Sequence, residues 1–236
     1  MIDSTRFEKF LNRVYKECIV NEHSIYEKDV ITPNELLTWK DVENVINFNL
    51  GFVDIIDNNS NKIDIPALNY FWSSRIIQSK KSIFSLINSG NCFSITQCFY
   101  LNENINYLLS LIESKFDVIC DAHLYGGLDT SANSFRPHID IPSNFIIQID
   151  GETHWKIYKN IASDMFPQEQ INSMRVSNLE LDYEVVLSPG DCIYIPPRRF
   201  HEAIPLGKRL SVSIPAASRK YSNALPVDRC LYEFTK

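Results

Sequence analysis

The pattern of apolar and polar residues changes near residue 117. Before that point, apolar residues recur every three or four positions, which is the spacing of one helix face. Ser4 or Thr5 can cap the first such helix, whose apolar stripe begins at Phe7. The same spacing predicts further helices near residues 38–46, 79–87 and 103–116. We therefore expect the first ninety residues to be helical with polar connections, including an exposed turn at residues 57–61.

After Phe116, short runs rich in β-branched and aromatic residues follow one another. They predict strands at residues 118–125, 144–150, 153–158, 183–187, 192–195 and 209–214. Tight-turn signals such as Asp150-Gly151 separate these runs. Many short strands joined by tight turns are typical of a sandwich or barrel, rather than of a doubly wound parallel sheet. The segment 159–182, with a helix expected after Pro167, is predicted to be an insertion between strands.

A length of 236 residues suits one large domain. We interpret the change near residue 117 as helices packed around a β core, and not as a boundary between two domains. The expected organisation is a single domain over residues 1–236. It consists of a mainly helical region with the first strand (1–116), a β core that contains the insertion (117–217) and a C-terminal tail (218–236).

Composition narrows the classes of protein that remain. The net charge of −6 argues against a general nucleic-acid binder, which normally has a basic face. No apolar run is long enough to span a membrane, and the N-terminus lacks the apolar region of a signal peptide, so we expect a cytoplasmic protein. The six cysteines form no Cys-x-x-Cys pair and are expected to be free, mostly buried thiols.

Two histidine motifs carry the candidate chemistry. His138 and Asp140 should point to the same side of an extended segment, because alternate residues of a strand share a face. About sixty residues later, a Pro-Gly-Asp turn and a strand lead to His201, which a closed β-sandwich can bring opposite the first pair. Two histidines and one carboxylate form a facial triad that suits non-haem Fe(II). The alternative is two surface histidines in turns.

The residues around these motifs resemble a known family. The resemblance rests on Cys120–Tyr125, Pro137–Asp140, Phe145–Gly151, Trp155–Tyr158, Pro189–Asp191, Tyr194–Pro197 and His201-Glu202. Together these segments are similar to the JmjC oxygenases of the cupin fold, above all to the ribosomal oxygenases, over residues 86–217. The resemblance implies a mainly β protein with N-terminal helices around a double-stranded β-helix, a jelly-roll or cupin core. It also implies a dioxygenase that uses Fe(II), 2-oxoglutarate and O2 to hydroxylate protein side chains.

The same resemblance assigns residues to roles. His138, Asp140 and His201 match the iron ligands and are the candidate catalytic residues. Related halogenases have a small residue in place of the carboxylate, so Asp140 favours hydroxylation. The usual Lys or Arg, which holds the far carboxylate of 2-oxoglutarate, lies fifteen residues after the first ligand. In this chain that position is Thr153, which can donate one hydrogen bond but carries no charge.

Arg209 is the candidate replacement for the missing cation. The alternation over 209–214 places Arg209, Ser211 and Ser213 on one face of a strand. An Arg-x-Ser on the last core strand is how many other 2-oxoglutarate oxygenases hold this carboxylate, with a fork of hydrogen bonds. Tyr125, with its neighbour His123, could add a donor. A solvent-facing strand edge is the alternative for Arg209.

The other aromatic, histidine and arginine residues near the two motifs are not expected to take part in the chemistry. Trp155 is predicted to pack in the core, and His154 then lies on the surface. Arg136, Arg198 and Arg199 flank the ligand motifs, and we expect them to be solvated loop charges. Binding of an acidic substrate is the alternative for these three arginines.

The leading hypothesis is therefore hydroxylation of an amino-acid side chain in a peptide or protein. Only residues 218–236 follow the expected core, so we expect the long C-terminal region of the ribosomal oxygenases to be missing. This raises the case for a shorter peptide, such as a biosynthetic precursor, or for a small molecule or free amino acid. A metal-dependent cupin enzyme without 2-oxoglutarate and a non-catalytic binding module are further alternatives. No nucleic-acid or membrane partner is expected, and the oligomeric state is left open.

Overall fold

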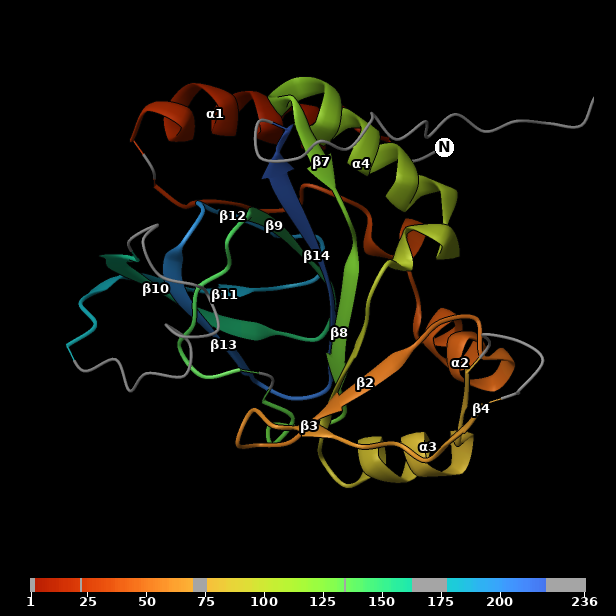
Figure 1. Cartoon of the computed structure of the whole chain (residues 1–236). Helices are drawn as coiled ribbons and strands as arrows, with labels where there is room; N and C mark the ends of the chain where they lie inside the picture. Colours follow the sequence, from red (N-terminus) through yellow and green to blue (C-terminus); the bar gives the residue numbers. More distant parts are fainter. Residues whose placement is uncertain (1–2, 22, 70–75, 134, 163–177, 220–236) are drawn as a thin grey trace, which may run out of the picture.

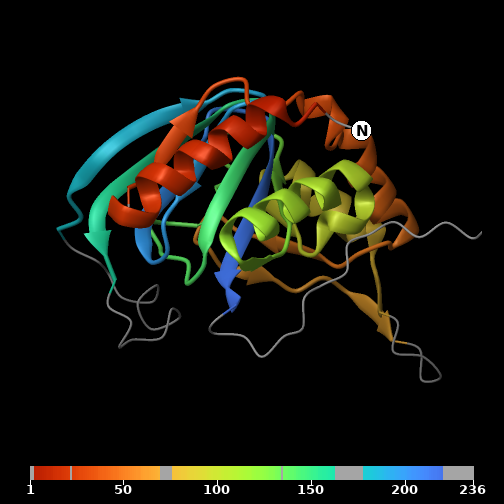
Figure 2. The same ribbon diagram turned by 90° about the horizontal axis from the view of Figure 1, so that it is seen from above.

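Helices cover the outside of a two-sheet β structure (Figure 1). The computed structural model describes residues 3–21, 23–69, 76–133, 135–162 and 178–219. The α-helices are α1 (Thr5–Asn21), α2 (Trp39–Phe48), α3 (Lys80–Asn88) and α4 (Glu103–Phe116), with two short 3-10 helices, η1 (Pro33–Glu35) and η2 (Cys98–Leu101). The four α-helices predicted before residue 117 are confirmed. Helices α1 and α4 contact each other and lie over one face of the larger sheet (Figure 2).

Local capping explains where two of these helices begin. The Asp41 carboxylate accepts a hydrogen bond from the backbone N–H of Thr38 at 2.8 Å, at the start of α2. At the start of α4, the Asn102 side chain accepts one from the backbone N–H of Asn104, also at 2.8 Å. Each bond satisfies a backbone donor that the helix itself leaves without a partner.

The N-terminal region also supplies six strands, where the sequence predicted only a first strand and did not place it. They are β1 (Ile25–Glu27), β2 (Val53–Ile56), β3 (Lys62–Ile63), β4 (Ala67–Asn69), β5 (Ile76–Gln78) and β6 (Cys92–Ile95). The expectation that the first ninety residues are helical with polar connections is therefore wrong in part. These strands are too short to show a periodicity, and in β6 all four residues are buried, so nothing alternates.

Two antiparallel sheets form the β core. The larger sheet adds β7 (Val118–Cys120), β8 (His123–Gly127), β9 (Ser143–Asp150), β12 (Cys192–Ile195) and β14 (Arg209–Ser218). Its order is β1-β12-β9-β14-β8-β6-β2-β3, with β7 also paired to β14. The second sheet is β11-β10-β13, from β10 (Thr153–Ile161), β11 (Leu181–Leu187) and β13 (Arg199–Pro205). This is the predicted jelly-roll type of core, surrounded by helices. Both edge strands of the larger sheet, β1 and β3, come from the first 63 residues.

The last strand separates the hydrophobic core from the interior between the sheets. Leu210, Val212 and Ile214 face the large apolar cluster that includes residues of α1 and α4. Arg209, Ser211 and Ser213 face the opposite way, into a cavity between the sheets. The predicted alternation along residues 209–214 is therefore confirmed, and polar side chains point inward because the apolar ones are needed under the helices.

The insertion between β10 and β11 differs from its predicted bounds, while the cysteines agree with the prediction. Strand β10 extends to Ile161 and β11 begins at Leu181, so the insertion is shorter than 159–182. The helix expected after Pro167 lies outside the described residues. Four cysteines are free and buried, as predicted: Cys92, Cys98, Cys120 and Cys192. Among the described helices, none is both long and apolar enough to cross a membrane.

Candidate metal centre and its cavity

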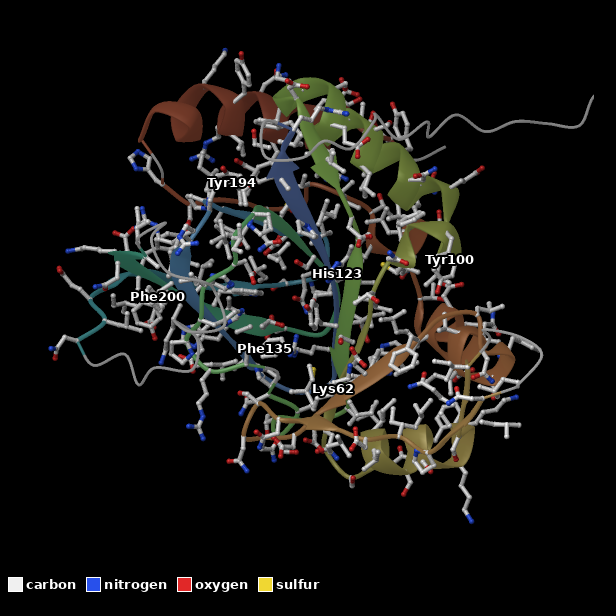
Figure 3. All side chains as sticks on the ribbon, in the orientation of Figure 1. Lys62, Tyr100, His123, Phe135, Tyr194 and Phe200 are labelled. Atoms are coloured by element: carbon white, nitrogen blue, oxygen red, sulfur yellow. The ribbon has the colours of Figure 1, made fainter. Side chains whose placement is uncertain are left out.

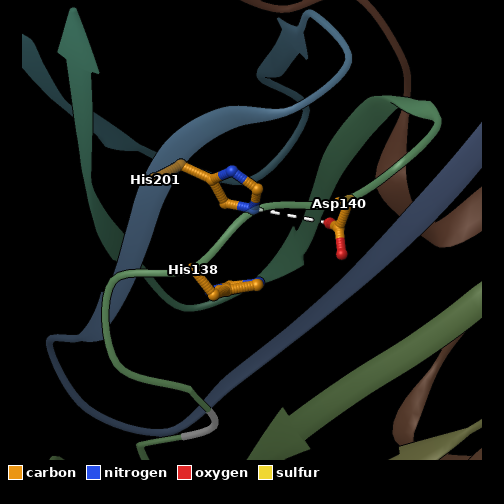
Figure 4. A group of neighbouring side chains, drawn as sticks. All are labelled: His138, Asp140 and His201. Atoms are coloured by element: carbon orange, nitrogen blue, oxygen red, sulfur yellow. Dashed lines mark ion pairs between the residues drawn. The ribbon is translucent and has the colours of Figure 1, made fainter. Parts of the chain in front are cut away.

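Main-chain pairing brings the two histidine motifs together. The backbone N–H of His138 donates to the carbonyl oxygen of His201 at 3.0 Å, and the N–H of His201 donates back to that of His138 at 2.9 Å. The two imidazole rings consequently lie with their centroids 4.4 Å apart (Figure 4). The backbone of a loop and of β13 thus fixes the spacing of two side chains that are far apart in the sequence.

Asp140 completes the group from the same loop as His138. Its Oδ2 atom lies 3.5 Å from Nε2 of His201 (Figure 4). The carbonyl oxygen of Asp140 accepts a hydrogen bond from the backbone N–H of Arg198 at 2.7 Å. The candidate ligand atoms of His138, Asp140 and His201 all lie within 4.8 Å of one another. The structure therefore brings together the three residues that the sequence predicted as a triad.

Hydrogen bonds also orient both imidazoles. Nδ1 of His138 lies 2.9 Å from the carbonyl oxygen of Arg136, and Nδ1 of His201 lies 2.8 Å from that of Arg199. A carbonyl can only accept, so Nδ1 of each ring carries a hydrogen and Nε2 is the nitrogen that can face a metal. Burial, together with the nearby His201, lowers the pKa of His138 to about 4, so this imidazole is neutral at neutral pH.

Aromatic rings pack against the two histidines. The ring centroids of Trp155 and His201 lie 6.0 Å apart, with 32° between the ring planes. The ring centroid of Phe135, which is on the loop before His138, lies 5.2 Å from that of His138 and 6.4 Å from that of Tyr125 on β8 (Figure 3). Trp155 belongs to an apolar cluster, as predicted, but it also lines the cavity, which sequence reasoning missed. These rings restrict the motion of the imidazoles.

The triad stands at the wall of a cavity of about 850 Å³. Polar side chains of β14, Tyr125 and the turn at residues 59–61 also line it. Burial and the charge of Asp140 raise the pKa of Tyr125, so its hydroxyl remains protonated and can donate a hydrogen bond. Ser211, only 3% exposed, lines the same cavity. The predicted candidates Tyr125 and Ser211 therefore do lie in one cavity with the triad.

Arg209 is the most unusual residue of this cavity. It is 1% exposed, and its Nε atom has no hydrogen-bond partner among the described residues. Its Nη2 atom donates to Cys92 Sγ at 3.9 Å and to the carbonyl oxygen of Ala132 at 3.5 Å. No carboxylate among the described residues pairs with it. A buried guanidinium without a counter-charge is costly, so this position fits an anionic ligand.

Thr153 occupies a different environment from Arg209. It is fully buried on β10, and its hydroxyl oxygen has no hydrogen-bond partner among the described residues. It does not, however, line the cavity that contains the triad. His123 of β8 does not line the cavity either, and its Nε2 atom lies 3.3 Å from Oδ2 of Asp121.

Two further parts of the site were missed by sequence reasoning. The Asn144 side chain donates from Nδ2 to Oδ2 of Asp140 at 2.7 Å, and the sequence shows only a polar residue near the start of a strand. The predicted exposed turn lies at the cavity wall, where Ser60 Oγ accepts a hydrogen bond from the backbone N–H of Arg136 at 3.2 Å. Asp57 holds the turn by accepting from the backbone N–H groups of Asn59 and Asn61.

The prediction of solvated loop charges is wrong for two of the three arginines. Arg198 and Arg199 are 8% and 7% exposed. Nε of Arg198 donates to the carbonyl oxygen of Ala162 at 3.0 Å, and Nη1 of Arg199 donates to that of Tyr158 at 3.1 Å. Both guanidinium groups can be buried because they donate to backbone carbonyls, one within β10 and one just after it. Arg136 is exposed and lines the cavity, which leaves it available to a substrate.

Comparisons with known proteins agree with this geometry. The model of the JmjC domain family matches residues 95–224. Ribosomal oxygenase 1 of Gallus gallus is 30% identical over 116 residues, which are 48% of this chain and 19% of that protein. The bifunctional lysine-specific demethylase and histidyl-hydroxylase NO66 of Brugia malayi is 29% identical over 128 residues, 52% of this chain and 18% of that protein. The chain spans about a fifth of the length of these curated relatives.

Solved structures show the same fold at low sequence identity. The ribosomal oxygenase YcfD of Escherichia coli, in complex with cobalt and 2-oxoglutarate, is similar with a TM-score of 0.61 and 14% identity, covering 100% of this chain and 63% of that one. Another crystal structure of YcfD gives a TM-score of 0.57 and 15% identity, covering 86% and 51%. The family match includes His138, Asp140 and His201 and extends over more than half of the chain. The chain therefore belongs to the JmjC domain family.

Proposed function

We propose that this chain is an Fe(II)- and 2-oxoglutarate-dependent oxygenase that hydroxylates an amino-acid side chain in a peptide or protein. One observation carries the proposal: three candidate ligand atoms within 4.8 Å share a cavity with a buried arginine that pairs with no carboxylate in the described part of the chain. Membership of the JmjC domain family supports it, as does the similarity to YcfD, which binds cobalt and 2-oxoglutarate.

The three ligands fit a divalent iron. His138 and His201 each leave Nε2 to face the metal because their Nδ1 atoms donate hydrogen bonds to carbonyls, and Asp140 offers a carboxylate oxygen. Two imidazoles and one carboxylate on one side of a metal leave other coordination positions open for a co-substrate and dioxygen. A third histidine or a cysteine, which would favour zinc, is absent from this cluster in the described part of the chain.

The cavity also fits 2-oxoglutarate, which is a dicarboxylate. Arg209 would hold the far carboxylate through a fork of charge-assisted hydrogen bonds, and this contact would give its buried charge the partner that the protein does not supply. Ser211 and Tyr125 line the same cavity with hydroxyl donors. Thr153 lies outside the cavity lining, so the charge comes from the last strand in this chain and not from the family's usual position. This arrangement favours an oxygenase over a cupin enzyme that does not use 2-oxoglutarate.

The protein's own residues would bind the metal, orient the co-substrate and exclude water from the cavity. With iron and 2-oxoglutarate bound, the site would supply the oxidation of a C–H bond by dioxygen, giving a hydroxyl group in the product, succinate and carbon dioxide. Trp155, Phe135 and Ile146 form apolar parts of the cavity wall that keep water away from the triad. Asp140 and the two imidazoles hold the metal, while Arg209 fixes the direction of the co-substrate.

The substrate would be an amino-acid side chain that enters the cavity past the turn at residues 59–61. The exposed Asn59, Asn61 and Arg136 at this wall provide polar groups for the adjoining peptide backbone. The curated relatives are named as a ribosomal oxygenase and a histidyl-hydroxylase, names that refer to protein substrates. We infer a polypeptide substrate on this basis, with a precursor peptide as the narrower option.

Consumption of 2-oxoglutarate tests the proposed function. The protein is loaded anaerobically with Fe(II) and exposed to O2 and 2-oxoglutarate, with and without a library of peptides, and succinate is measured. We expect succinate to form, and a peptide to gain the mass of one oxygen atom. The His138→Ala variant should form none. Tight iron binding without 2-oxoglutarate binding by calorimetry, and without succinate, would contradict the oxygenase and favour a metal-dependent cupin enzyme.

A further inference from the structure

A buried amide contacts the carboxylate of the candidate metal centre. Asn144 is the second residue of β9, four residues after Asp140, and is 4% exposed. Its Nδ2 atom donates a hydrogen bond to Oδ2 of Asp140 at 2.7 Å. The same oxygen lies 3.5 Å from Nε2 of His201. The Asn144 amide and the His201 imidazole therefore approach the same carboxylate oxygen of Asp140.

The orientation of this amide is fixed by a second contact. Ser213 of β14 donates from Oγ to Oδ1 of Asn144 at 3.4 Å. An ionised carboxylate can only accept hydrogen bonds, so the NH2 group must face Asp140 and the amide oxygen must face Ser213. The order Ser213, Asn144, Asp140 thus connects the last core strand to the metal loop through side chains alone.

We propose that Asn144 is a positioning residue of the metal centre, which holds the Asp140 carboxylate in the orientation that the metal requires, and that Ser213 holds Asn144. The inference rests on the proposed metal binding at the triad. The side chain of Asp140 is 30% exposed and lies on a loop, where a side chain can adopt several orientations. The hydrogen bond from Asn144 favours one of them before the metal binds, which lowers the entropy that binding costs.

The structure offers a matched control at the neighbouring position. Ser143 is also buried at the start of β9, and its hydroxyl donates to the carbonyl oxygen of Ala216 at 3.1 Å. It therefore helps to anchor the same end of the strand to β14 through a hydrogen bond that does not involve the Asp140 side chain. A variant at Ser143 reports the effect of weakening the strand start, and a variant at Asn144 reports that effect plus the loss of the carboxylate contact.

Cobalt binding by calorimetry tests the proposal, with Co(II) as the probe. Loss of a residue that orients a ligand typically costs about 10–100-fold in metal affinity. We expect Asn144→Leu to raise the Kd for Co(II) by about this factor and to change the visible absorption bands of bound Co(II). Ser213→Ala should give a smaller increase of the same sign, and Ser143→Ala should leave both the Kd and the bands unchanged. Circular dichroism and thermal unfolding of the metal-free proteins check that each variant folds.

The possible outcomes separate this inference from the proposed function. An unchanged Kd in a folded Asn144→Leu protein, or an equal rise in Asn144→Leu and Ser143→Ala, would overturn the positioning role. If Asn144→Leu does not fold, the Ser213→Ala variant tests the positioning role instead. An unchanged Kd for Co(II) and unchanged absorption bands in Ser213→Ala would then overturn that role. Failure of the unmodified chain to bind Co(II) would instead reject the metal centre itself.

Discussion

The main chains of His138 and His201 exchange two hydrogen bonds, so the pairing of these residues does not depend on their side chains. The ligand spacing is a property of the backbone, set where the loop before β9 meets β13. Each imidazole is then oriented by a carbonyl two residues upstream in its own segment. Loss of one imidazole should therefore remove a ligand without disturbing the frame that holds the others.

Substitution of either histidine tests this separation between frame and ligand. We expect His138→Ala and His201→Ala each to weaken Co(II) binding by more than about 100-fold, because a ligand contributes more than the residues that orient it. The thermal unfolding midpoint of the metal-free protein should change little. The matched control is His154→Ala, since His154 lies on β10 and pairs with Glu184 away from the cavity. Stoichiometric metal in the His138→Ala protein would contradict the ligand assignment.

Removal of the charge at Arg209 should separate co-substrate binding from stability. Two hydrogen bonds to a charged group are worth about 1.5–3 kcal/mol each, so we expect Arg209→Met to weaken 2-oxoglutarate binding about 100-fold or more. The free energy of unfolding should stay the same or rise, because the variant removes a buried charge that has no counter-charge. Calorimetry and urea unfolding measure the two effects.

Thr153→Val is the control for that experiment. Thr153 is fully buried but does not line the cavity, so 2-oxoglutarate should bind this variant with unchanged affinity. A large loss in Thr153→Val together with unchanged binding in Arg209→Met would place the carboxylate at the family's usual position instead.

The lowered pKa of His138 predicts a pH dependence of stability. Its pKa is about 4 in the folded chain, against an ordinary value of 6.5. Between these two values the unfolded chain binds more protons at this residue than the folded chain does. The free energy of unfolding of the metal-free protein should therefore fall as the pH falls from about 6.5 to 4. Urea unfolding across this range measures it, and the slope should be smaller in His138→Ala. Equal slopes in both proteins would argue against the shift.

The turn at the cavity wall should affect the substrate and not the metal. The Asp57 carboxylate accepts hydrogen bonds from the backbone N–H groups of Asn59 and Asn61, and these bonds lower its pKa. We expect Asp57→Ala to speed hydrogen exchange at residues 58–61 and to leave Co(II) affinity unchanged. Peptide hydroxylation should fall relative to 2-oxoglutarate consumption. Asp64→Ala, an exposed change just after β3, is the control. Weaker Co(II) binding in Asp57→Ala would show that the turn supports the triad instead.

The parts that were predicted from sequence are those with local signals. The start of α4 follows from Asn102, and β12 follows from a buried run closed by two prolines. The triad could be predicted because its residues are rare and their spacing is characteristic of a family. The inward face of β14 followed from simple alternation along 209–214.

The parts that were missed depend on contacts between distant segments. Strand β1 has three residues and exists because it pairs with β12, far along the chain. Arg198 and Arg199 are charged residues in a loop motif, and only the folded chain brings carbonyls of β10 and the segment after it within reach. The role of Asn144 becomes visible only when the loop at Asp140 turns back over the start of β9.

The larger sheet is closed at both edges by strands from the first 63 residues, β1 beside β12 and the β2–β3 pair beside β6. A polypeptide cut to the family-matched region, 95–224, would keep the three ligands but lose all three of these strands and nearly all of β6. The exposed flanks of β12 and β8 would then offer unpaired backbone groups to other chains. We expect such a fragment to precipitate or to assemble into β-rich aggregates, which would show that the N-terminal segment keeps the β core from joining with its own copies.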